Sequence, residues 1–280
     1  MPDAVHIERD GTIATIFLNR PERLNAVDLN MAMLLVRHLH GLAHDDAISS
    51  VIITGSGQAY CAGGDLGWAA AYPGGPANGL HVLASHVHQA LLEIHRVDKP
   101  VIAAVNGVAA GAGFSLALAC DFRVMDEAAT FRQAYTSAGL SIDGGGTFML
   151  PRLVGLARAL EIAAFDKPID AQHAASTGLA TRIARAGEAL NDARALAREL
   201  DARSRTSFAY SKRLLRRSAE IPMEVQLELE REAIVACARA AEGAEGIDAF
   251  ISKRAPDFIG ARTVARSTGR QVSPRTDLSL

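Results

Sequence analysis

A long uncharged stretch, residues 101–120, constrains this chain more than any other part of its sequence. Its length is close to that of a helix that spans a bilayer, which needs about 20 residues. However, a proline precedes the stretch at position 100, and residues that break helices interrupt it. We therefore predict a buried strand, a glycine turn and a buried helix here, and no membrane span. The interrupting residues are Asn106, Gly107, Gly111 and Gly113.

Strand and helix patterns alternate through the first half of the chain. Residues 12–18 alternate in polarity and are rich in β-branched side chains, which predicts a strand. Asp28 is a good N-cap for a helix that continues to His44 with apolar residues at helical spacing. This alternation indicates an α/β fold. The other elements that we expect are strands at 50–54 and 101–105, a loop at 55–79 and a helix at 80–96.

Helical patterns dominate the second half of the chain. They occur at 157–165, 188–204, 207–217, 222–241 and 245–254. The last residues are polar and have no periodic apolar face, which is typical of a disordered end. We therefore expect a core over residues 1–200, a helical region over 201–262 and a disordered tail over 263–280.

Composition excludes several classes of partner. The formal net charge is −2, which argues against a basic surface that binds nucleic acid. Cys61, Cys120 and Cys237 lie far apart and are odd in number, which favours free thiols in a reducing compartment. The polar start of the chain shows no signal-peptide pattern. We expect a soluble cytoplasmic protein with no nucleic-acid or membrane partner.

Two familiar catalytic signatures are absent. The segment Gly113–Ala117 lacks the spacing of the nucleophile elbow, and Ser115 is better explained as a small polar residue in a packed helix. The helix expected at 80–96 carries several histidines but no H-E-x-x-H arrangement, so we interpret them as surface residues and expect no metal site. These histidines are His81, His86, His88 and His95.

Two glycine-rich segments, 60–66 and 106–114, each follow a predicted buried strand. Glycine lets a backbone approach a ligand closely, and the N-terminus of a helix offers unpaired N–H groups to a negative charge. If both turns converge, their N–H groups could form an oxyanion hole. The residues alone leave an equal alternative, in which the segments are tight turns within an α/β core.

A series of short motifs occurs in a characteristic order. They are Asn19–Ala26, Tyr60–Leu66, Lys99–Gly107, Gly111–Gly113, Ala119–Asp121, Gly139–Leu140, Asp143–Gly145 and Leu150–Gly155. In their order and spacing, the chain from Val5 to Arg262 resembles the crotonase (enoyl-CoA hydratase/isomerase) family. The resemblance implies a spiral of ββα units, followed by a helical C-terminal region that builds homotrimers or dimers of trimers.

The resemblance also implies a substrate and a binding site. Members of the family bind an acyl-CoA thioester and stabilise its enolate with two backbone N–H groups, which correspond to those of Gly64 and Ala112 here. Coenzyme A is then part of the substrate, and no separate cofactor is expected. The residues that match positions contacting the substrate or CoA are Arg23, Ala26, Ala62, Asp65, Leu66, Tyr135, Phe250 and Lys253.

The catalytic acids of the family are only partly matched. Enoyl-CoA hydratases use two glutamates, where this chain has Ser115 and Tyr135, and a hydroxyl is a poor base near neutral pH. Asp143 matches the catalytic aspartate of other members, including isomerases and a dehalogenase. The alternative is that Asp143 only caps the helix that follows it. The dehalogenase interpretation is weaker. It needs a histidine where this chain has Gln89 or a neighbour such as His88, and a tryptophan where it has Tyr135 or Thr136.

One carboxylate suits a 1,3-proton transfer, in which the same acid removes and returns a proton. We therefore expect an enoyl-CoA isomerase, either of the Δ3–Δ2 or of the ring-epoxide type, with Asp143 as the catalytic residue. Two alternatives remain open at this point. One is a hydratase or lyase with an atypical active site, and the other is a non-catalytic acyl-CoA-binding protein.

Overall fold

The computed structural model describes residues 3–267, which divide into two compact units. The first contains residues 3–97 and 101–197, and the second contains residues 98–100 and 198–267. The model has the expected mixture of helices and parallel strands. Within residues 3–267, no helix is both long enough and apolar enough to cross a membrane.

The first unit is built on two sheets. One has six strands in the order β1-β2-β3-β5-β7-β10, parallel except for the β1–β2 pair. The other has four strands in the order β4-β6-β8-β9. The strands are β1 (Val5–Asp10), β2 (Ile13–Leu18), β3 (Ser50–Gly55), β4 (Ala59–Cys61), β5 (Val101–Val105), β6 (Val108–Ala110), β7 (Phe122–Asp126), β8 (Thr130–Arg132), β9 (Ile169–Asp170) and β10 (Arg182–Ala184).

From β3 to β8, successive strands alternate between the two sheets. The pairs β3–β4, β5–β6 and β7–β8 each place one strand in the large sheet and the next in the small one, and a helical segment follows each pair. This is the spiral of ββα units that we expected from the resemblance. The helical elements of the first unit are η1 (Pro21–Arg23), α1 (Leu29–His44), α2 (Leu66–Ala71), α3 (Pro76–Arg96), α4 (Ala112–Ala119), η2 (Thr136–Ala138), α5 (Gly146–Val154), α6 (Leu156–Phe165) and α7 (Ala171–Ser176).

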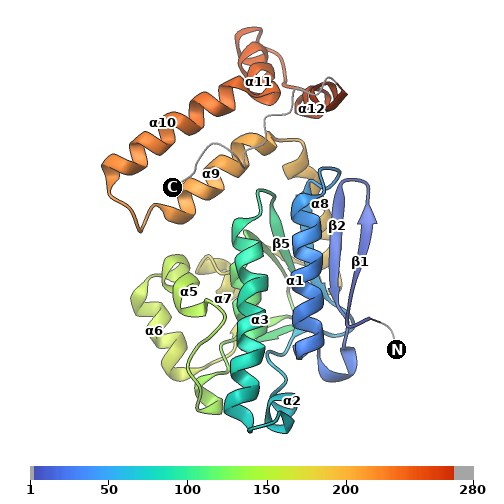
Figure 1. Cartoon of the computed structure of the whole chain (residues 1–280), viewed down its shortest axis with the longest axis vertical. Coiled ribbons are helices and arrows are strands. Elements are labelled where there is room, and N and C mark those ends of the chain that lie inside the picture. Colours follow the sequence, from blue (N-terminus) through green and yellow to red (C-terminus); the bar gives the residue numbers. More distant parts are fainter. Residues whose placement is uncertain (1–2, 268–280) are drawn as a thin grey trace. The chain divides into compact units, whose positions relative to one another are not determined.

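Burial explains the strands of the large sheet. Every residue of β3 and β5 is buried, as is usual for parallel strands that are covered on both faces. Helices α1 and α3 pack against each other over this sheet (Figure 1). The side chain of Asp28 accepts a hydrogen bond from the Met31 N–H at 2.8 Å, so the predicted N-cap of α1 is confirmed.

The uncharged stretch folds as predicted, with one addition. Residues 101–105 form β5 and residues 112–119 form α4, but the turn between them also contains the short strand β6. The expected loop at 55–79 similarly contains β4 and α2, and α3 begins at Pro76 rather than at residue 80. Strands and helices this short carry no detectable period in the sequence.

Helix α8 (Ala189–Asp201) runs into the second unit, which contains α9 (Arg205–Arg217), α10 (Met223–Arg239), α11 (Ala241–Ile251) and α12 (Phe258–Ser267). The prediction of a disordered tail from residue 263 is wrong for residues 263–267, because α12 includes them. The rest of that prediction, residues 268–280, lies outside the described residues. Hydrogen bonds made by Arg262 explain why the chain is ordered here.

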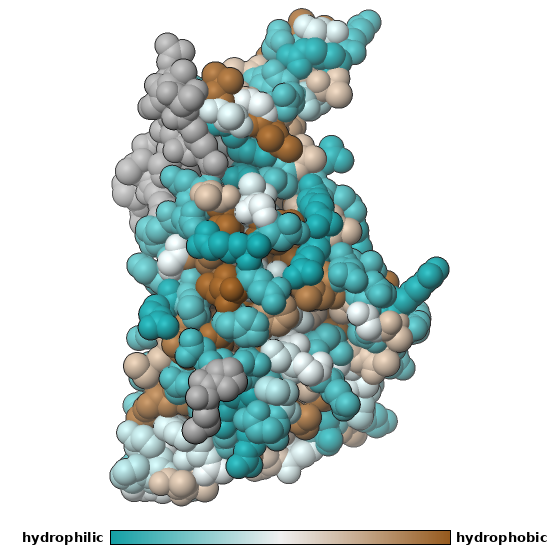
Figure 2. Space-filling view, turned by 90° about the vertical axis from the view of Figure 1, so that its right-hand side faces the viewer, coloured by the Kyte–Doolittle hydropathy of each residue, from teal (hydrophilic) through white to brown (hydrophobic). Residues whose placement is uncertain are grey.

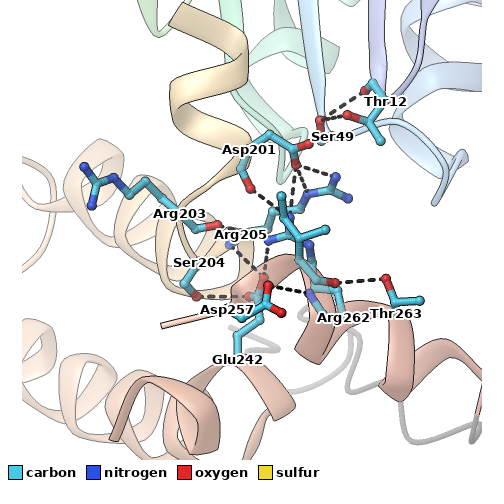
Figure 3. A network of polar contacts seen from close by, with 12 residues as sticks. Thr12, Ser49, Asp201, Arg203, Ser204, Arg205, Glu242, Asp257, Arg262 and Thr263 are labelled. Carbon is cyan, nitrogen blue, oxygen red and sulfur yellow. Dashed lines mark hydrogen bonds and ion pairs between the residues drawn. The ribbon is translucent and has the colours of Figure 1, made fainter. Parts of the chain in front are cut away.

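Arg262 lies between two carboxylates of the second unit (Figure 3). Its guanidinium is 2.7 Å from Glu242 Oε1 and 3.1 Å from Asp201 Oδ1. Glu242 also accepts hydrogen bonds from the Ser204 hydroxyl and the Thr206 N–H. Burial would raise the pKa of Glu242, but these donors hold it below its usual value. The carboxylate is 3% exposed, so it depends on its partners.

Replacing Arg262 with alanine should therefore lower the free energy of unfolding by about 3–5 kcal/mol, the usual cost of leaving a buried charge unpaired. Denaturant unfolding followed by circular dichroism measures this loss. Arg231→Ala is the matched control, because the Arg231–Glu228 pair lies on an exposed surface of the same unit and should contribute at most about 1 kcal/mol. Equal losses for both variants would contradict the role given to Arg262.

Candidate active site

The two glycine-rich segments meet in the structure. Strands β4 and β6 pair in parallel, so the turns that follow them leave the same edge of the small sheet. A Cβ added to Gly111 would lie 3.7 Å from the Gly63 α-carbon, and one added to Gly63 would lie 3.4 Å from the Ala112 nitrogen. Both glycines have positive φ, +108° at Gly63 and +51° at Gly111, which disfavours larger residues.

Two N–H groups at this meeting point have no acceptor within residues 3–267. Ala112 is the first residue of α4, where an N–H has no intrahelical partner, and its φ is not positive. Gly64 forms a bridge with Val27, but the hydrogen bonds of that bridge use the Gly63 carbonyl and the Asp65 N–H. The N–H groups of Gly64 and Ala112 are therefore available to an oxyanion.

The loop that carries Asp143 is fastened to the same helix. The hydroxyl of Ser115, one turn along α4 from Ala112, donates a 2.6 Å hydrogen bond to the main-chain oxygen of Asp143. Gly144 follows with φ +63°, and a Cβ there would lie 3.0 Å from the Ser115 Cβ. Glycine at 144 thus lets the loop lie against α4. Ser115 is buried in the packed helix, as predicted, but it also positions this loop.

The side chain of Asp143 pairs with His88 of α3. Asp143 Oδ1 lies 2.6 Å from His88 Nε2, and the two side chains are 40% and 48% exposed. The Asp143 carboxylate is therefore partly open to solvent. The helix-cap alternative is wrong, because the N-cap of α5 is Gly145 and no side chain caps that helix.

His88 is a site residue that the sequence indicated only as a possible match for the histidine of the dehalogenase. It is exposed, as predicted for the histidines of this helix, but its hydrogen bond joins residues 55 positions apart in the chain. The other signal was the accumulation of histidines on one predicted helix. Neither signal indicates that His88 faces Asp143.

Tyr135 is a further polar residue beside Ser115. Its hydroxyl lies 3.4 Å from the Ser115 hydroxyl, and burial raises the pKa of Tyr135 to about 12. A phenol that holds its proton so tightly can donate a hydrogen bond but cannot act as a base near neutral pH. Ser115 and Tyr135 therefore do not supply the pair of acids used by hydratases, and the carboxylate residue fastened beside them is Asp143.

Most of the residues predicted to contact CoA lie together. The segment 23–27 runs beside residues 62–65, joined by the Ala62 N–H to the Leu24 oxygen and by the bridge at Gly64. Arg23 is exposed, as is half of Leu66. These segments contain Arg23, Ala26, Ala62, Asp65 and Leu66, and their contacts with CoA stay a prediction.

The Asp65 carboxylate already has partners within the protein. It accepts a hydrogen bond from the Trp68 N–H, which caps α2, and another from Arg20. Burial would raise the pKa of Asp65, but these donors hold it below its usual value. Its side chain therefore fixes the start of α2.

Phe250 and Lys253 belong to the second unit. Phe250 is 85% exposed in α11, and Lys253 follows that helix with a positive φ of 54°. Their predicted contacts with CoA stay predictions.

Known proteins match this chain over most of its length. The enoyl-CoA hydratase/isomerase family matches residues 8–261. A 1,2-epoxyphenylacetyl-CoA isomerase from Escherichia coli K12 is 36% identical, over 91% of this chain and 97% of that protein. A 2,3-dehydroadipyl-CoA hydratase from the same organism is 34% identical, over 91% and 98%. The crystal structure of an enoyl-CoA hydratase from Polaromonas sp. JS666 superposes with a TM-score of 0.86 at 36% identity, covering 90% of this chain and 98% of that one.

The chain thus belongs to the enoyl-CoA hydratase/isomerase, or crotonase, family. The predicted family and fold are confirmed. The relatives include both isomerases and hydratases by name, so membership alone does not separate the two reactions.

Proposed function

We propose that this protein is an enoyl-CoA isomerase that moves a proton along an acyl-CoA thioester with Asp143. The observation that carries this proposal is that the carboxylate held against α4 belongs to Asp143, whereas the Asp65 carboxylate caps α2. Asp143 is held by Ser115 and His88 beside the helix that begins at Ala112, and the neighbouring side chains Ser115 and Tyr135 are not acids. The name of one relative, a 1,2-epoxyphenylacetyl-CoA isomerase, supports an isomerisation.

In the proposed reaction, the Asp143 carboxylate removes a proton from the α-carbon of a 3-enoyl-CoA. The electron pair of that C–H bond moves toward the thioester carbonyl, and the N–H groups of Gly64 and Ala112 stabilise the resulting enolate oxygen. The carboxylic acid then returns a proton to the γ-carbon, which completes the shift of the double bond. Asp143 takes up one proton and returns one proton in each turnover, so no other reactant is consumed.

The experiment that tests this proposal offers the protein a 3-enoyl-CoA and a 2-enoyl-CoA separately. We expect the 3-enoyl-CoA to become its 2-enoyl isomer, with no change in mass. Chromatography with mass detection separates this product from a 3-hydroxyacyl-CoA, which gains the mass of water. A ring-epoxide CoA ester tests the second isomerase type. Hydration of the 2-enoyl-CoA without isomerisation, or no turnover of any substrate, would contradict the proposal.

Hydration is the second candidate function. It is favoured by relatives that are named hydratases, and by the partial exposure of the Asp143 carboxylate, which leaves room for water. In this reaction Asp143 would act alone on the water molecule. The same product analysis distinguishes the two functions directly.

Substrate binding in this proposal requires no separate cofactor, because coenzyme A is part of the substrate. Arg23 is suited to a CoA phosphate, since its guanidinium is exposed beside the Asp65 segment. We also propose a cytoplasmic location, which the three free cysteines support.

We propose further that the protein assembles into homotrimers or dimers of trimers. The face drawn in Figure 2 carries hydrophobic residues in separate brown areas between hydrophilic ones. Several large apolar side chains of the second unit are more than half exposed, which is typical of surfaces that bind other chains. Sedimentation equilibrium measures the state directly. The most exposed of these side chains are Leu215, Met223, Ile234, Phe250 and Ile251.

A further inference from the structure

We propose that His88 is a proton relay between Asp143 and bulk solvent, so that the proton returned to the substrate comes largely from water. This inference rests on the proposed isomerase function and adds to it a role for a residue outside the carboxylate and the oxyanion hole. It concerns the origin of the returned proton, which the reaction class alone does not specify.

His88 is in contact with both Asp143 and solvent. Its Nε2 lies 2.6 Å from Asp143 Oδ1, which is within hydrogen-bond distance. The imidazole is also 48% exposed on α3, so water reaches it. Because Oδ1 is occupied by His88, Oδ2 is the oxygen left to approach the substrate. The imidazole thus lies between the carboxyl group and solvent.

Three other side chains described near Asp143 cannot carry its proton to solvent. Tyr135 interacts electrostatically with Asp143 and with Cys61, and burial raises the pKa values of Tyr135 and Cys61 to about 12. Both groups therefore keep their protons near neutral pH. The Ser115 hydroxyl is committed to the main-chain oxygen of Asp143. The imidazole of His88, in contrast, has two ring nitrogens, and the one that faces Asp143 is Nε2.

The relay step conserves atoms and charge. In the resting pair, His88 Nε2–H donates to the Asp143 carboxylate. After Asp143 has taken the substrate proton, water adds a hydrogen to Nδ1 and removes the one on Nε2, and the carboxyl group turns about the Cβ–Cγ bond to present its O–H to Nε2. The proton passes to Nε2, which gives a carboxylate and an imidazolium. The imidazolium exchanges its N–H hydrogens with water. A solvent proton then returns from Nε2 to the carboxylate, and Asp143 delivers it to the γ-carbon.

Isomerisation in deuterium oxide tests the relay through the label in the product. For the unaltered protein we expect deuterium at the γ-carbon of most molecules formed in the first turnovers. For His88→Gln we expect the deuterium content to fall several-fold, because the amide can still hydrogen-bond to Asp143 but cannot carry a proton. The original hydrogen then returns within the same turnover. His81→Gln, a substitution of another histidine on the same helix, is the matched control and should leave the label unchanged.

A second variant separates relay from positioning. In His88→Ala, imidazole added to the medium should restore deuterium incorporation, which a purely structural role of His88 would not predict. Unchanged label in His88→Gln, with turnover intact, would overturn the relay and show that Asp143 exchanges directly with water. Absence of isomerisation in the unaltered protein would overturn the proposed function itself, so the two failures are distinguishable.

Discussion

Replacing Asp143 with asparagine should lower kcat for the isomerisation of 3-enoyl-CoA by about 10²–10⁴-fold, the usual contribution of a positioned acid or base. Asparagine has nearly the same shape as aspartate, but its amide cannot take up the substrate proton. The oxyanion donors Gly64 and Ala112 remain in place. We therefore expect the loss in kcat and little change in the affinity for acyl-CoA. Steady-state kinetics with direct acyl-CoA binding measures both.

The fold of the Asp143→Asn variant should be preserved. The amide oxygen of the substituted side chain can still accept a hydrogen bond from His88, and the contact between Ser115 and residue 143 uses the main chain, which the substitution does not alter. Circular dichroism and thermal unfolding verify this. Full activity in the folded variant would show that Asp143 is not the acid–base group. This result would contradict the proposed proton transfer by Asp143.

Much of the core could be predicted because its signals are local. The strands β3 and β5 and the N-cap of α1 are encoded in short stretches of apolar residues and in one well-placed aspartate. The glycine turns could also be located, because the positive φ at positions 63 and 111 strongly favours glycine. What could not be read from these residues was that the turns meet, since this depends on the pairing of β4 with β6.

Side-chain pairs that join distant elements could not be predicted from the sequence. His88 and Asp143 come from a helix and a loop that each look ordinary in isolation, and nothing in the spacing between them indicates contact. The same holds for Arg262, whose bonds to Asp201 and Glu242 order a segment that looked like a polar tail. In both cases tertiary contacts decide the role of a polar residue that has no periodic pattern.

The Ala112 N–H can be removed with little change to the fold, which gives the second large effect. Ala112 is the first residue of α4, a position where proline is well tolerated because the N–H has no partner within the helix. Ala112→Pro should therefore keep the helix and delete one oxyanion donor. We expect kcat to fall by about 10²–10³-fold, the cost measured for single donors elsewhere. Steady-state kinetics on 3-enoyl-CoA measures the loss.

The matched control is Ala241→Pro. Ala241 is likewise the first residue of a helix, α11, and the preceding Ala240 has ψ 153°, which suits a residue before proline. Both substitutions remove an N–H at the same helical position, but only the one at Ala112 lies beside Gly63 and Gly64. Normal activity in Ala241→Pro together with the loss in Ala112→Pro would assign the effect to the missing donor. Normal activity in both would mean that the enolate oxygen binds elsewhere, because a proline at 112 leaves no N–H there to stabilise it.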